Sequence, residues 1–151
     1  MAYFASQSQR KLYLFDTFSG FDSSDIKGID KDKTAGHFSD TSLNMAKDVI
    51  GNYNETCFFI KGHFPNSISE FHRSRQYAVV HLDLDLYEPM KAGLNFFYSR
   101  MPKGGLFLLH DYSSMCWEGA KKAIDEFCME QNQYIILMPD KSGSAFIRKS
   151  N

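Results

Sequence analysis

The sequence has few of the features that mark several common protein classes. It holds only three cysteines in 151 residues, Cys57, Cys116 and Cys128, with no CxxC pair. This odd number favours neither a disulfide framework nor a cysteine-rich zinc site, and it indicates buried or idle thiols in a reducing compartment. The apolar runs are only a few residues long, whereas a membrane helix needs roughly 20.

Excess charge and targeting signals are also lacking. The net charge is −1, which gives no electrostatic reason for a nucleic-acid or acidic-membrane partner. The opening residues MAYFASQSQRK lack the charged start and long apolar centre of a secretory signal. We therefore expect a cytoplasmic protein that binds neither nucleic acid nor membranes.

The composition that remains is that of a globular protein. Hydrophobic residues make up 43% and charged residues 23%, as in ordinary soluble domains. The 14 Phe and 8 Tyr predict an aromatic-rich core. The length fits one domain over residues 1–151.

Short apolar runs alternate with helical patterns along the chain, and the residues before position 11 look like the end of a helix. Strands are predicted at 11–16, 56–62, 77–83 and 105–111, helices at about 41–50, 89–101 and 120–128, and a terminal hairpin at 134–138 and 145–149. This order predicts an α/β fold whose sheet is mostly parallel, with an antiparallel C-terminal hairpin.

Local signals place the ends of the first long helix. Ser39 or Asp40 is expected to cap it, Val49 to lie in its apolar stripe, and Gly51 to end it. The preceding segment, residues 17–38, is rich in Gly, Ser, Asp and Lys. Loops of that length are usually functional or mobile, so a lid and a disordered segment both remain open as interpretations.

Acidic residues gather where two predicted strands end, in HLDLDLYEP (81–89) and LLHDY (108–112). Ligands bind beyond the carboxyl ends of parallel strands. Because neighbouring strands lie about 4.8 Å apart, Asp83 and Asp111 are expected to reach one ion. His110 is a candidate third ligand, a proton acceptor, or a simple hydrogen-bonding residue.

Several residues close to these candidate ligands in the sequence have two possible roles. Asp85 is expected either to bind the ion or to cap the helix that follows, in whose first turn Pro89 fits. Tyr87, Tyr112 and Trp117 either line an acceptor pocket or pack in the core.

Four motifs occur in order: FDTFSGF, LDLDLYEP, PKGGLFLLHDY and GAKKAIDEF. Together they resemble the macrocin O-methyltransferase (TylF/MycF) family, from about residue 11 to residue 147. The resemblance implies a Rossmann-like class I methyltransferase fold that uses S-adenosylmethionine and a divalent metal, usually Mg²⁺. It also implies a small-molecule acceptor, the hydroxyl of a sugar or natural product.

The resemblance also assigns roles to residues. Asp83, His110 and Asp111 fall on the metal-binding positions, and Asp16 falls where an acidic residue accepts hydrogen bonds from the ribose of the cofactor. The family usually has two acidic residues where this chain has His110 and Asp111. Since imidazole suits manganese, iron or zinc better than magnesium, Mn²⁺ is an alternative ion. No general base is named.

The sequence departs from the family pattern in the part that is expected to bind the cofactor. No Gly-rich turn precedes Lys11, so we expect this chain to lack the first strand and the Gly-rich turn that cradle the methionine part of the cofactor in the family. The alternatives to an impaired enzyme are a non-catalytic remnant that serves as an interaction module, and homo-oligomerisation through exposed strand edges. A DxD phosphatase is disfavoured, because Tyr87 stands where that chemistry needs Thr or Val.

Overall fold

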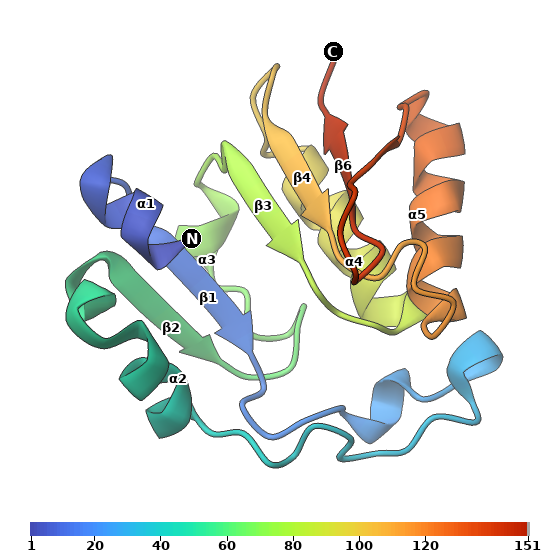
Figure 1. The fold of residues 1–151 in the computed structure, drawn as a ribbon, viewed down its shortest axis with the longest axis horizontal. Helices are drawn as coiled ribbons and strands as arrows, with labels where there is room; N and C mark the ends of the chain where they lie inside the picture. The colour runs from blue at the N-terminus through green and yellow to red at the C-terminus, as the bar shows by residue number, and fades with distance from the viewer. Residues whose placement is uncertain (151) are drawn as a thin grey trace. The chain divides into compact units, whose positions relative to one another are not determined.

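The computed structural model describes residues 1–150 and alternates helices with strands (Figure 1). Short 3-10 turns lie at Ser23–Asp25, Gly28–Asp30 and Gly51–Thr56. The helices and strands are, in order, α1 (Ala2–Gln7), β1 (Leu12–Asp16), α2 (Leu43–Ile50), β2 (Cys57–Lys61), α3 (Glu70–Arg73), β3 (Val79–Leu82), α4 (Tyr87–Tyr98), β4 (Leu106–Leu109), α5 (Glu118–Gln131), β5 (Ile136–Leu137) and β6 (Ala145–Arg148).

The contacts divide the chain into two compact units. Unit 1 holds Met1–Ser24 and Lys33–Ser67, and unit 2 holds Asp25–Asp32 and the chain from Ile68 onward. The short segment Asp25–Asp32 thus belongs to a different unit from the residues on either side of it. The expected single domain stays a prediction.

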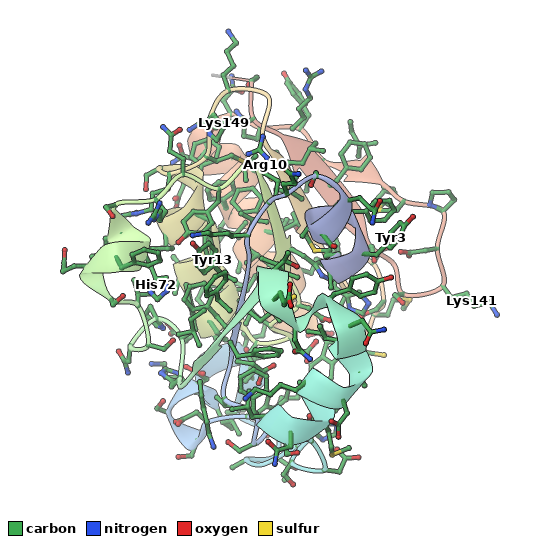
Figure 2. All side chains as sticks on the ribbon, turned by 90° about the vertical axis from the view of Figure 1, so that its left-hand side faces the viewer. Tyr3, Arg10, Tyr13, His72, Lys141 and Lys149 are labelled. Atoms are coloured by element: carbon green, nitrogen blue, oxygen red, sulfur yellow. The ribbon has the colours of Figure 1, made fainter. Side chains whose placement is uncertain are left out.

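Unit 1 is built on a pair of parallel strands. β1 pairs with β2 in register from Leu12 opposite Cys57 to Asp16 opposite Lys61. Aromatic rings cover this pair: Tyr13, marked in Figure 2, stacks on Phe58 with ring centroids 5.4 Å apart. This aromatic pair is not a core contact, because Phe58 is 42% exposed; the buried aromatic residues of unit 1 include Phe18 and Phe64.

Helix α2 differs in detail from its predicted form. Its N-cap is Ser42, whose hydroxyl accepts a hydrogen bond from the Met45 amide at 3.2 Å, so the prediction of Ser39 or Asp40 is wrong. Val49, expected in the apolar stripe of this helix, is 88% exposed, so the core does not cover that part of the stripe. Gly51 ends the helix with φ +57°, a conformation that glycine adopts without strain.

Unit 2 contains a four-stranded mixed sheet with the order β3-β4-β6-β5. β3 and β4 are parallel, while β6 runs antiparallel to both β4 and β5. The terminal hairpin is confirmed, although its first strand is shortened to Ile136–Leu137.

The core of unit 2 lies between this sheet and helices α4 and α5, which lie on one side of the sheet in Figure 1. Alternate strand residues point to that side, since side chains on a strand alternate between its faces. They pack with residues that recur at helical spacing. The buried set comprises Val80, Leu82, Phe107, Leu109, Ala145 and Ile147 from the strands, and Met90, Leu94, Phe97, Ala120, Ile124 and Phe127 from the helices.

The C-terminus of α4 is bound by a lysine that directly follows β6. The Lys149 ammonium, marked in Figure 2, donates to the carbonyl oxygens of Tyr98 and Met101, both at 2.8 Å. A cation at a helix C-terminus also interacts favourably with the helix dipole. Within residues 1–150, no helix is both long and apolar enough to span a bilayer.

Candidate functional site

The ends of β3 and β4 lie side by side because the two strands pair in parallel. Leu82 is the partner of Leu109, and the His110 amide donates to the Leu82 carbonyl at 3.0 Å. The residues after each strand, Asp83 on one side and His110 with Asp111 on the other, therefore emerge at the same edge of the sheet.

Three side chains converge at this edge. One ligand atom each from Asp83, His110 and Asp111 lies within 4.8 Å of the others. The His110 Nδ1 atom is 3.0 Å from Asp83 Oδ1 and 2.6 Å from Asp111 Oδ2. The Asp111 side chain is 12% exposed and that of Asp83 is 50% exposed, so the cluster opens to solvent on the Asp83 side.

The backbone after each strand adopts an uncommon conformation. Asp85 and Asp111 have φ of +56° and +58°, a left-handed region that few residues other than glycine, Asn and Asp enter readily. The Leu86 amide donates to the Leu84 carbonyl across Asp85, which makes a three-residue turn. Such conformations persist where the surrounding structure enforces them, often at functional sites.

Of the two roles predicted for Asp85, the structure contradicts the capping role. Asp85 caps no helix, because α4 has Leu86 as its N-cap with no side-chain cap, and the capping hypothesis is wrong. It is also absent from the converging set of three ligand atoms. Instead its carboxyl is buried and shares a hydrogen bond with Asp111. Asp85 therefore helps to orient the Asp111 carboxylate, which is a candidate ligand.

The pKa values of Asp85 and His110 are both raised in this cluster. Burial, the hydrogen bond to Asp111 and the charge of Asp83 raise the pKa of Asp85 to about 7. Partial burial acts to lower the pKa of His110, but the hydrogen bond to Asp111 and the nearby carboxylates outweigh it and raise that pKa. A carboxyl whose pKa lies near neutrality is suited to proton transfer.

The donor set fits a divalent cation. Two carboxylates offer the oxygen ligands that Mg²⁺ and Mn²⁺ take, and an imidazole nitrogen adds a donor that Mn²⁺ accepts more readily than Mg²⁺. A cation would replace the proton on His110 Nδ1, because a ligating imidazole nitrogen must be deprotonated.

Asp16, the candidate for the cofactor ribose, lies in unit 1. It is the last residue of β1, and its Oδ1 atom accepts from the Phe18 amide at 2.7 Å and from the Thr17 hydroxyl at 3.4 Å. These bonds orient an exposed carboxylate at the carboxyl end of a parallel strand, which fits an acceptor for ribose hydroxyls.

Asp30 is a buried residue that the sequence did not single out. It is 1% exposed, and its Oδ2 atom accepts from the Tyr87 amide at the start of α4 at 2.7 Å. A Cβ added at Gly119, in the first turn of α5, would overlap the same carboxylate. The Asp30 carboxylate therefore lies at the N-termini of both α4 and α5, where the helix dipoles favour a negative charge.

This position gives the segment 17–38 a partly structural role. Residues 25–32 are bound to unit 2 through Asp30, so this part of the segment is neither disordered nor a free lid. No sequence signal marks Asp30, because the helix starts it serves are more than 50 residues away in the chain.

We expect Asp30→Ala to lower the free energy of unfolding by about 3 kcal/mol, as the sum of a lost cap and a lost dipole interaction. Gly119→Ala is expected to destabilise as well, although alanine favours helices by about 1 kcal/mol over glycine, because its methyl group would displace Asp30. Urea unfolding of both variants measures the two effects. Stability equal to the wild type in Gly119→Ala would contradict the placement of Asp30.

Comparison with known families decides the classification. The model of the macrocin-O-methyltransferase (TylF) family matches residues 2–146, nearly the whole chain. The chain belongs to this family. Comparison with curated proteins finds no match.

Solved structures agree with this TylF assignment at the level of the fold. The O-methyltransferase NovP has a TM-score of 0.80 at 21% identity, with 100% of this chain and 66% of that chain covered. The calicheamicin methyltransferase CalS11 has a TM-score of 0.78 at 21% identity, with 99% and 66% covered. An S-adenosylhomocysteine-bound methyltransferase from Podospora anserina, PaMTH1, has a TM-score of 0.54 at 13% identity, with 99% and 76% covered.

These matches confirm the predicted family and the methyltransferase-like α/β fold. The chain spans about two thirds of the length of NovP and CalS11. In this TylF-family chain the structure describes one helix, α1, before β1.

Proposed function

We propose that this TylF-family chain is an S-adenosylmethionine-dependent, metal-assisted O-methyltransferase that acts on a hydroxyl of a sugar or natural product. The observation that carries the proposal is the convergence of Asp83, His110 and Asp111 within 4.8 Å in a fold shared with O-methyltransferases. We take Mg²⁺ as the cognate ion, with Mn²⁺ as the alternative that His110 favours.

In this proposal Asp83, His110 and Asp111 would hold the ion, which would lower the pKa of the acceptor hydroxyl and make its oxygen a better nucleophile. The cofactor would supply a methyl group bound to a sulfonium sulfur, which would leave as the thioether when the oxygen takes the methyl group. The hydroxyl proton has to leave the oxygen. Asp85 is the buried carboxyl nearest in the chain to this ligand set and is our candidate to receive it, because it is hydrogen-bonded to Asp111.

Asp16 is proposed to hold the ribose of S-adenosylmethionine at the end of β1. Its Oδ1 atom is already engaged by the Phe18 amide, which fixes the orientation of the carboxylate.

Calorimetric titration with S-adenosylmethionine, with and without Mg²⁺ or Mn²⁺, tests the proposal. We expect the protein to bind the metal ion. A Kd for the cofactor tighter than about 100 μM, roughly −5.5 kcal/mol, would indicate a competent pocket. One of the matched structures is described as a TDP-rhamnose 3'-O-methyltransferase, so a TDP-linked deoxysugar is a suitable first acceptor for a methyl-transfer assay. Absence of both metal and cofactor binding would contradict the enzyme proposal and favour the non-catalytic interaction module.

A further inference from the structure

Two tyrosines close to the candidate ligands donate their hydroxyls to helix α5: Tyr87, the first residue of α4, and Tyr112, in the turn after β4. Tyr87 lies two residues after Asp85, and its hydroxyl donates to Glu126 Oε2 at 2.6 Å. Tyr112 directly follows Asp111, and its hydroxyl donates to Asp125 Oδ1 at 2.7 Å. The start of α4 and the turn after β4, which are separate in sequence, are thus bound to neighbouring residues on one helix.

The acceptor carboxylates are themselves fixed by lysines. Lys121 pairs with Asp125, while Lys91 and Lys122 lie 3.5 and 3.9 Å from the Glu126 carboxylate. The hydrogen bond from Tyr87 and these two lysines lower the pKa of Glu126, so it stays an acceptor.

The donors are equally well defined. The Tyr112 hydroxyl is part-buried at its bond to Asp125, and a phenol is a hydrogen-bond donor at neutral pH. The backbone amide of Tyr87 is held by Asp30 at 2.7 Å. Tyr87 is therefore fixed at both its backbone and its side chain, between the Asp85 turn and α5.

We infer that Tyr87 and Tyr112 are positioning residues, through which α5 sets the separation of the two turns that bear Asp83, His110 and Asp111. This inference rests on the proposed metal role of those three residues. Groups that orient metal ligands affect affinity even though they do not touch the ion. Tyr87 and Tyr112 would then act neither as acceptor-pocket residues nor as simple packing residues, the two roles that the sequence left open.

Tyrosine-to-phenylalanine variants separate the hydroxyl bond from the packing of the ring. We expect Tyr87→Phe and Tyr112→Phe each to weaken Mn²⁺ binding about tenfold, the lower end of the effects of such supporting groups, and the double variant to weaken it further. Tyr98→Phe, at the opposite end of α4, is the matched control and should leave the Mn²⁺ Kd unchanged. Calorimetric titration with MnCl₂ measures the affinity, and thermal unfolding confirms that the variants remain folded.

Two variants of the acceptor side give a rescue test. Asp125→Asn keeps an oxygen that can accept from Tyr112, whereas Asp125→Leu does not, and both remove the same charge. Mn²⁺ affinity close to the wild type in Asp125→Asn with a loss in Asp125→Leu supports the inference. Equal affinity in all the tyrosine variants, or equal loss in both Asp125 variants, would overturn it.

Amide hydrogen exchange of the metal-free protein separates failure of this inference from failure of the proposed function. We expect the Leu86 and Ser114 amides, each bonded within its own turn, to exchange faster in the double tyrosine variant than in Tyr98→Phe. If the wild type binds no metal, the proposed function fails, while faster exchange at both turns still supports the role of α5. Unchanged exchange at both turns would overturn that role whatever the metal result.

Discussion

Asp111→Asn is expected to weaken the binding of Mn²⁺ or Mg²⁺ by more than about 100-fold, beyond the range seen for groups that only support metal ligands. Asp111 is the least exposed of the three converging residues, and its Oδ2 atom lies 2.6 Å from His110 Nδ1. An amide is neutral and offers one weaker oxygen, so the variant loses both a ligand and the charge that orients His110. Methyl transfer to any acceptor should fall with metal affinity.

The asparagine change leaves the backbone unstrained, because Asn tolerates the left-handed conformation that Asp111 adopts at φ +58°. Asp32→Asn, an exposed change in the same unit, removes the same charge and is the matched control. Calorimetric titration of both variants with MnCl₂ gives the comparison. Equal Mn²⁺ affinities in Asp111→Asn and Asp32→Asn would show that the ion, if bound, is held elsewhere.

Asp85→Asn is expected to remove a large pH dependence from the stability of the metal-free protein. The folded state raises the pKa of Asp85 to about 7, against about 3.9 in an unfolded chain. Between these two values the folded protein binds more protons than the unfolded one, so wild-type stability falls as pH rises from about 4 to 7. The loss amounts to at most about 4 kcal/mol, at about 1.4 kcal/mol for each pKa unit.

Asparagine donates a hydrogen bond to Asp111 at every pH, as protonated Asp85 does, but has no proton to lose. Metal-free Asp85→Asn should therefore lose less stability than the wild type between pH 4 and pH 8. Urea unfolding across this range, with Asp32→Asn as the control, measures the difference. Parallel pH profiles for the wild type and Asp85→Asn would contradict the buried, protonated state of Asp85.

The strands and helices were predictable where the local pattern is strong. Every predicted strand and helix is present, because the short apolar runs of the strands and the helical spacing in α4 and α5 are local properties of the chain. The errors arose at α2, where Ser42 rather than Ser39 or Asp40 forms the cap. Its apolar stripe is also poorly buried, since Val49 is 88% exposed; local periodicity states which residues share a face but not whether anything covers it.

The convergence of Asp83 and Asp111 was predictable for a general reason. Once two runs are taken as neighbouring parallel strands, their carboxyl ends must meet at one edge, and the register of Leu82 with Leu109 brings the residues that follow into range. The role of Asp85 was not predictable. It depends on a left-handed turn that buries its carboxyl, and the pattern DLD does not reveal this.

The sequence by itself therefore determined the family, the order of strands and helices, and the candidate ligands, because each is encoded in residues close together in the chain or in motifs kept in order. Only the tertiary structure decided the hydrogen-bond partners of Asp30, Tyr87 and Tyr112. Their partners lie 57, 39 and 13 residues away, and hydrogen bonds over such separations exist only after α4, α5 and the segment 25–32 have packed together.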